Sequence, residues 1–175
     1  GIARLAVIGF IVALAASLVD TIWAVYMDSF INNISIVGFI SAGLTIISLL
    51  SYFVFIPLIE KKKKSRIYLF TLILMALTYL LFAINRKFYI FIILSFVFTI
   101  LLTLKITSFG IIVKDRCKEK NLPRNEGLMY TFLNIAWLIG PLISGYISEA
   151  FGINIIFLLS AIFIAIAAIT FKISR

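Results

Sequence analysis

Residues 36–59 read IVGFISAGLTIISLLSYFVFIPLI, an apolar run without a single charged side chain. A helix of about 20 apolar residues crosses the hydrocarbon core of a bilayer, which is roughly 30 Å thick. Inside that core the backbone N–H and C=O groups find no water, so they must pair within the segment. The run therefore predicts a membrane-spanning α-helix.

Five further stretches of the same kind lie on either side of this run. They cover residues 5–27, 67–84, 88–113, 127–150 and 153–171. The chain is 63% hydrophobic and 13% charged, whereas about 25% of residues are charged in soluble domains. The first stretch is longer than the about 7–15 apolar residues of a signal peptide. We therefore expect an all-α membrane protein whose residues 1–175 form a single domain of six transmembrane helices.

Short connections join several of the predicted helices. Residues 28–35, 85–87 and 151–153 are too few to hold a separate domain. Connections of this length make neighbouring helices run antiparallel and pack as hairpins. Ser35 is expected to cap the helix of residues 36–59, and Gly152 is expected to separate the last two helices.

The side chains that most enzyme and metal sites need are scarce. The chain has one cysteine, Cys117, and no histidine. A disulfide within the chain, a Cys/His zinc site and a Ser-His or Cys-His catalytic pair are therefore excluded. We expect neither an enzyme nor a bound cofactor.

Lysine and arginine gather on one side of the predicted topology. Thirteen of them lie on that side: Arg4, Lys61, Lys62, Lys63, Lys64, Arg66, Lys114, Arg116, Lys118, Lys120, Arg124, Lys172 and Arg175. The other side has Arg86 and Lys87, and Lys105 lies within a span. Cytoplasmic loops carry an excess of these residues. We therefore expect a multi-pass protein of the cell membrane with both termini in the cytoplasm, and we ascribe the net charge of +9 to topology rather than to nucleic-acid binding.

Small and polar residues recur along three of the spans at helical spacing. The three stripes are Ala13, Ser17, Asp20, Thr21 and Ala24; Ser41, Thr45, Ser48 and Tyr52; and Ser95, Thr99, Thr103, Thr107 and Gly110. Such stripes favour close helix contact or a wet cavity, although single hydroxyls also bond to their own helix. Residues 67–84 and 153–171 are almost wholly apolar, and we expect them to be lipid-facing supports.

Asp20 is the acid that lies well inside a span. It sits about seven residues from the outer end of the first apolar stretch, so it lies about 10 Å below that surface. Acids at such depth usually mark ion or substrate pathways. We expect proton coupling or cation recognition at Asp20; the alternative is a polar tie to Thr21 or Asn134. The candidate pathway residues are Asp20, Ser17, Trp23, Tyr26, Thr99, Thr103 and Asn134. For Lys105 we expect a side chain that snorkels to the headgroups rather than one that binds substrate.

Residues 136–145, AWLIGPLISG, resemble the motif G-x-x-x-G-P-x-x-G-G in the fifth helix of major facilitator superfamily transporters. Ala136 and Ser144 replace two of the glycines but keep those positions small. The resemblance and the physics of small residues assign Gly140, Pro141, Ser144 and Gly145 to helix packing, since proline bends the helix and small side chains let another helix approach.

Residues 56–66, IPLIEKKKKSR, resemble that family's loop motif G-x-L-A-D-R-x-G-R-K more loosely. Leu58 matches, Glu60 stands for the acid and Lys61 for the following base, but both glycines are missing. In the family this loop locks helix ends on the cytoplasmic side. The resemblance therefore implies a gating loop of Glu60, Lys61, Lys64 and Arg66; the alternative is a topological anchor of lysines.

The resemblance covers the whole chain at the level of pattern and implies one six-helix half of a transporter. Such a half consists of two inverted three-helix repeats, with helices one and four lining a cavity. The implied function is secondary active transport of a small solute by alternating access, ion-coupled, with efflux or antiport favoured. The partners would be the lipid bilayer, the solute and a second six-helix half from the same polypeptide or another copy. The alternative is a complete six-helix protein of another class, a channel or an assembly scaffold, although the re-entrant loop or charged rings of a selectivity filter are not evident.

Overall fold

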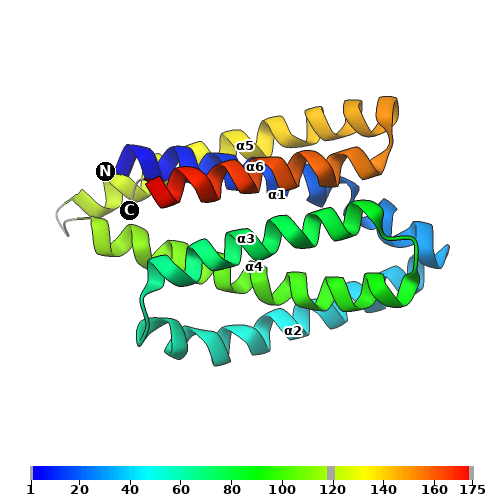
Figure 1. Ribbon diagram of the computed structural model, residues 1–175, viewed down its shortest axis with the longest axis horizontal. Coiled ribbons are helices and arrows are strands. Elements are labelled where there is room, and N and C mark those ends of the chain that lie inside the picture. The colour runs from blue at the N-terminus through cyan, green and yellow to red at the C-terminus, as the bar shows by residue number, and fades with distance from the viewer. Residues whose placement is uncertain (1, 118–120, 174–175) are drawn as a thin grey trace.

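The computed structural model describes residues 2–117 and 121–173, and in these residues the chain forms six α-helices and no β-strand (Figure 1). The helices are α1 (Ile2–Ile31), α2 (Ile34–Glu60), α3 (Lys64–Ile84), α4 (Phe88–Arg116), α5 (Leu122–Phe151) and α6 (Ile153–Ile173). All six are long and apolar enough to cross a membrane. The prediction of an all-α protein with six such helices is confirmed.

Most of the helices extend beyond the apolar stretches that predicted them. The helix α1 ends at Ile31 rather than at residue 27, and α5 begins at Leu122 rather than at residue 127. The apolar stretch marks the part of each helix that suits the hydrocarbon core, whereas the backbone hydrogen bonds of the helix continue into polar residues beyond that part. Asp20 therefore lies about eleven residues from the end of α1, or about 16 Å along the helix axis.

The ends of α2 and α5 show how local sequence sets the connections. The Asn33 side chain accepts hydrogen bonds from the backbone N–H groups of Ser35 and Ile36, at 3.0 and 3.3 Å, so Asn33 and not Ser35 caps α2. Gly152 separates α5 from α6, as expected, with φ at 90°, a conformation that glycine adopts without strain.

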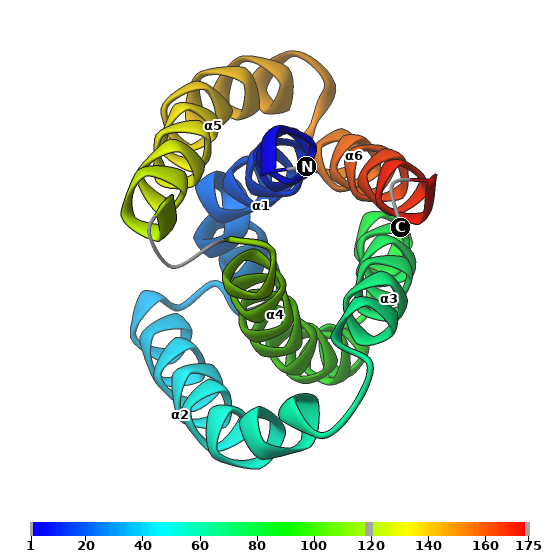
Figure 2. The ribbon, with the colours of Figure 1, turned by 90° about the vertical axis from the view of Figure 1, so that its left-hand side faces the viewer.

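The helices are arranged around two central members, α1 and α4 (Figure 2). The helix α1 packs against α5 and α6, α4 packs against α2 and α3, and α3 packs against α6. Between α2 and α5 the described residues make no extensive contact. The side of the bundle between α2 and α5 is therefore open, and the opposite side is closed by α3 and α6.

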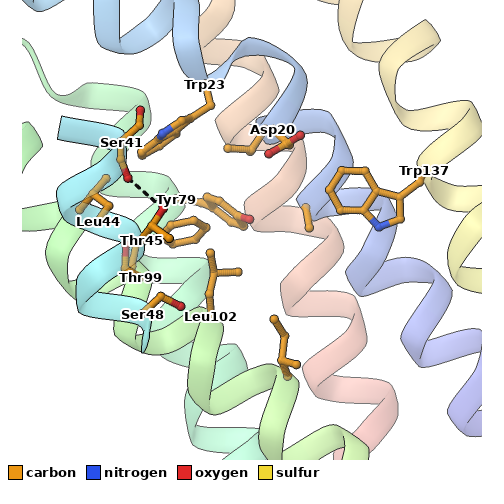
Figure 3. A pocket seen from close by; sticks show the side chains of 14 residues that line it. Asp20, Trp23, Ser41, Leu44, Thr45, Ser48, Tyr79, Thr99, Leu102 and Trp137 are labelled. Carbon is orange, nitrogen blue, oxygen red and sulfur yellow. Dashed lines mark hydrogen bonds between the residues drawn. The ribbon is translucent and has the colours of Figure 1, made fainter. Parts of the chain in front are cut away.

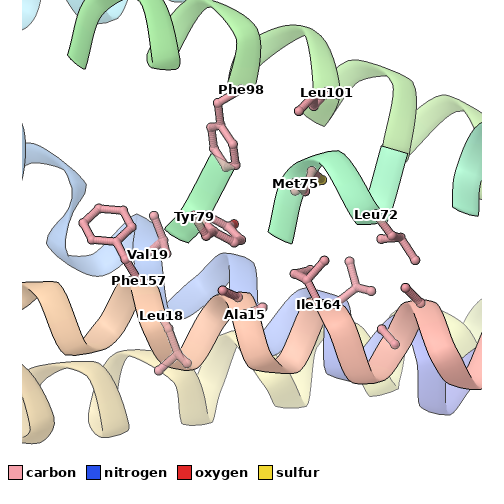
Figure 4. Packing of buried hydrophobic residues seen from close by; sticks show 14 of the residues in the cluster. Ala15, Leu18, Val19, Leu72, Met75, Tyr79, Phe98, Leu101, Phe157 and Ile164 are labelled. Carbon is pink, nitrogen blue, oxygen red and sulfur yellow. The ribbon is translucent and has the colours of Figure 1, made fainter. Parts of the chain in front are cut away.

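The core lies where α1, α3, α4 and α6 meet (Figure 4). Leu18, Leu72 and Phe157 are fully buried there, and the Tyr26 hydroxyl donates a 2.9 Å hydrogen bond to the carbonyl of Phe82. The supports α3 and α6 present apolar outer faces, but their inner faces build this core. Composition could not separate the two faces, because an apolar side chain suits lipid and protein interior alike.

Candidate functional site

A cavity of about 470 Å³ lies between α1, α2, α4 and α5 (Figure 3). Its wall is formed by Ala16, Val19, Asp20, Trp23, Ser41, Leu44, Thr45, Ser48, Tyr79, Phe98, Thr99, Leu102, Ile106 and Trp137. This volume suits a small organic molecule, since ligand pockets usually measure about 300–1,000 Å³. The wall is mostly apolar with a few polar groups, as such pockets commonly are.

Asp20 supplies the one charge among the described residues of this wall. Its side chain is exposed, and within residues 2–117 and 121–173 it forms no hydrogen bond or salt bridge. An acid at the centre of a membrane helix costs about 2.5–3.5 kcal/mol on insertion scales. Facing a cavity relieves part of this cost, because water or a ligand can reach the carboxylate.

Two tryptophans flank Asp20 in the cavity wall (Figure 3). The Trp23 ring packs edge-on against Phe82 at a centroid distance of 5.4 Å and stacks on Phe98 at 6.0 Å. Trp137 comes from α5 and is 43% exposed. Trp23 is thus held in place by aromatic neighbours, while the more exposed Trp137 stands on the opposite side of the carboxylate.

Tyr79 of α3 brings a second unpaired polar group to the wall. The residue is 0% exposed, and its hydroxyl has no hydrogen-bond partner among the described residues. Leaving a buried hydroxyl unpaired costs about 1–3 kcal/mol. The sequence pattern did not point to Tyr79, because residues 67–84 are almost wholly apolar and carry no polar stripe.

The hydroxyls of α2 and α4 are mostly bonded to their own helices. Thr45 donates to the Ser41 carbonyl at 3.0 Å, and Thr99 donates to the Ser95 carbonyl at 2.8 Å. Each oxygen can still accept a further hydrogen bond from a ligand or water. The stripe on α2 was evident in the sequence, but only the structure places Ser41, Thr45 and Ser48 in the same wall as Asp20.

Of the seven candidate pathway residues, Asp20, Trp23 and Thr99 line the cavity. Ser17 is buried against α5, Tyr26 is buried in the core, and Thr103 is buried beside Ser48, 3.3 Å from its hydroxyl. Asn134 is exposed on α5 and is absent from the described wall. The polar tie from Asp20 to Thr21 or Asn134 is not formed, since Thr21 donates to the Ser17 carbonyl instead.

The stretch of α5 at residues 136–145 meets α1 with one of its two faces. The Ser17 hydroxyl donates to the Ala136 carbonyl at 3.1 Å, and the Ser144 hydroxyl donates to the Leu18 carbonyl at 2.7 Å. A Cβ added at Gly140 would lie 2.7 Å from the Ser17 Cβ. Pro141 is exposed, and a Cβ at Gly145 would meet nothing within 4 Å among the described residues. Gly140 and Ser144 are therefore packing residues, whereas Pro141 and Gly145 face away from α1.

The basic loops lie at the end of the bundle that also holds both termini (Figure 1). There Lys64 at the start of α3 forms a salt bridge of 2.8 Å with Asp115 near the end of α4. Glu60, Lys61 and Arg66 are exposed and form no salt bridge within the described residues. Lys118, Lys120 and Arg175 lie outside the described residues. Of the four proposed gating residues, only Lys64 thus connects two helices.

Lys105 is half-buried on α4 and is not part of the described cavity wall. It forms no salt bridge with Asp20 or with any other described acid. The Asp20 carboxylate therefore has no basic partner within the described residues.

Comparison with known proteins gives one family. Residues 5–174 match the family model of the Major Facilitator Superfamily. No curated protein matches the chain.

Proposed function

Because the chain belongs to the major facilitator superfamily, whose members are membrane transporters, we propose that it is one six-helix half of a twelve-helix secondary transporter. In this proposal a small solute binds in the cavity beside Asp20 and crosses the membrane by alternating access. The observation that carries the proposal is the Asp20 carboxylate, which lies in the wall of a ligand-sized cavity and has no basic partner among the described residues. Family membership itself points to transport rather than to catalysis.

The contacts between helices support the proposed inverted repeats, α1–α3 and α4–α6. Each helix of the first repeat has a counterpart in the second: α1 corresponds to α4, α2 to α5 and α3 to α6. Under this correspondence the contacts of α1 with α5 and α6 match the contacts of α4 with α2 and α3. The contact of α3 with α6 maps onto itself. A repeat of this kind allows a transporter to open to either side, because the two repeats can exchange conformations.

The open side of the bundle supports a second six-helix half as the partner. The helices α2 and α5 border this side, and their described residues make no extensive contact with each other. The cavity lies between these two helices, so a body placed against them would close it. The second half would be part of the same polypeptide or another copy.

We further propose that the end with the basic loops and the termini faces the cytoplasm of the cell membrane. Arg4, Lys61, Lys62, Lys63 and Lys64 all lie at that end, whereas Arg86 and Lys87 lie at the other. The excess of positive charge agrees with the topology of most multi-pass proteins.

Asp20 is the group that we assign to ion coupling, with antiport of protons against the solute as the favoured mode. A carboxylate can carry a proton when the solute is absent and release it when a solute takes its place. Asp20 alone is enough for this mechanism, because the proton and the solute compete for the same carboxylate.

The test is proton flux in proteoliposomes that hold a pH-sensitive dye and an imposed pH gradient. We expect a panel of small solutes to include one that collapses the gradient in the wild type. Asp20→Asn should abolish this flux, because the amide keeps the size of the side chain but cannot bind a proton. Asp28→Asn, on the same helix but outside the described wall, is the matched control. Wild-type flux with unchanged pH dependence in Asp20→Asn would contradict the coupling role.

A further inference from the structure

The chemistry of the cavity wall indicates the charge of its ligand. Asp20 is exposed to the cavity, it has no ionic partner within the described residues, and Lys105 stays outside the wall. A single carboxylate in an apolar environment favours a cation over a neutral molecule or an anion, because little solvent screens the attraction.

The walls around Asp20 favour an organic cation over a metal ion. The described residues hold no group of three or more potential metal-binding side chains, whereas Ca²⁺ requires about 6–8 oxygen ligands. Trp23 and Trp137 instead stand on two sides of the carboxylate (Figure 3). Tryptophan faces attract ammonium groups and also pack against apolar bodies.

Tyr79 adds a requirement for hydrogen bonding. Its hydroxyl is buried and has no hydrogen-bond partner within the described residues, and Tyr79 lies in the wall of the same cavity as Asp20. A tyrosine oxygen can accept a hydrogen bond from an N–H group. An ammonium that carries N–H groups could therefore satisfy both Asp20 and Tyr79, whereas a quaternary ammonium could satisfy only the charge.

We infer, on the premise of the transport function proposed above, that the cavity takes a protonated organic amine with an apolar or aromatic body. The ammonium group binds between the Asp20 carboxylate and the Tyr79 hydroxyl, and the body lies against Trp23, Trp137 and the apolar wall at Leu102. Asp20 determines that the ligand is a cation, and Tyr79 determines that the cation carries an N–H group.

Intrinsic fluorescence provides a direct readout of this binding. Within residues 1–175 the tryptophans are Trp23 and Trp137, and both line the cavity. Purified protein in detergent is titrated with N-methylbenzylammonium, which carries two N–H groups, with benzyltrimethylammonium and with the uncharged benzyl methyl ether. We expect a saturable change with the first probe, severalfold weaker binding of the quaternary cation, and binding of the ether weaker by about tenfold or more. Equal affinities for the amine and the ether would overturn the inference.

Two variants separate the contributions of charge and hydrogen bonding. Asp20→Asn should weaken binding of both cations by about tenfold or more and leave the ether unchanged. Tyr79→Phe should weaken binding of N-methylbenzylammonium by about 2–10-fold and remove its advantage over the quaternary probe. Asp28→Asn, which removes an acid from α1 outside the described wall, should bind all three probes as the wild type does. Equal losses for both cations in Tyr79→Phe would overturn the role of the hydroxyl.

The same titration distinguishes this inference from the proposed function, because binding in detergent requires no transport. Saturable amine binding without amine movement in proteoliposomes would support the site and contradict transport. Gradient-driven movement of an uncharged solute without amine binding would contradict the site and leave the transport function standing.

Discussion

The contact of α5 with α1 and the contact of α2 with α4 hold equivalent places in the bundle but differ in closeness. Ala136, Gly140 and Ser144 of α5 are buried against α1, and two hydroxyl-to-carbonyl hydrogen bonds cross between these helices. In α2 only Ser51 and Ile59 are buried among the described residues. A hydroxyl pair, Ser48 with Thr103, is the side-chain hydrogen bond that links α2 to α4.

The difference follows from the size of the residues at each contact. Glycine and alanine let the backbones of α1 and α5 approach until side-chain hydroxyls reach carbonyls of the other helix. The partly buried residues of α2 that pack against the core, Val37, Ile40 and Leu44, are larger and do not allow that approach. We therefore expect α5 to stay fixed to α1, and α2 to move more easily relative to α4 when the transporter changes state.

The largest effect is expected at Gly140. The added Cβ of Gly140→Ala would overlap Ser17 at its hydroxyl and lie 2.7 Å from its Cβ, and overpacking of this kind costs about 1–3 kcal/mol. Gly145→Ala is the matched control, since it adds the same methyl group to the same helix where nothing lies within 4 Å among the described residues. Thermal unfolding in detergent should show a lower midpoint for Gly140→Ala and an equal or higher one for Gly145→Ala. Equal unfolding midpoints for the two variants would contradict the close packing of α5 against α1 at Gly140.

A smaller effect is expected from Ser144→Ala. This change removes the hydrogen bond to the Leu18 carbonyl without adding bulk, and hydrogen bonds between membrane helices contribute about 0.6 kcal/mol on average, with a maximum near 1.7. The loss should be measured as a reduced free energy of unfolding in a denaturant titration. Ser148→Ala, whose hydroxyl bonds within its own helix, is the control. A Ser144→Ala variant as stable as this control would show that the hydroxyl contributes nothing to the contact.

The smallest effect is expected from Ser48→Ala on α2. The hydroxyl pair with Thr103 is 3.3 Å long, and Thr103 also bonds to the Thr99 carbonyl. The loss should therefore fall at or below about 0.6 kcal/mol in the same denaturant titration. A cost as large as that of Ser144→Ala would mean that both contacts are equally firm and that α2 is not the looser helix.

The sequence by itself determined the number and kind of helices, because length and apolarity are local properties of each stretch. It also placed Asp20 inside a span, and it predicted close packing for residues 136–145, of which Ala136, Gly140 and Ser144 are buried. These features depend on composition and spacing within one helix, so no knowledge of the neighbours was needed.

Only the tertiary structure decided which residues meet. Ser17 and Asp20 both belong to the stripe predicted on α1, yet Ser17 binds α5 and Asp20 faces the cavity. Tyr79 reaches the same cavity from an apolar span, and Asn134 does not reach it from a polar one. Helical spacing fixes which residues share a face, but the crossing and rotation of the other helices determine whether that face meets lipid, another backbone or an open cavity.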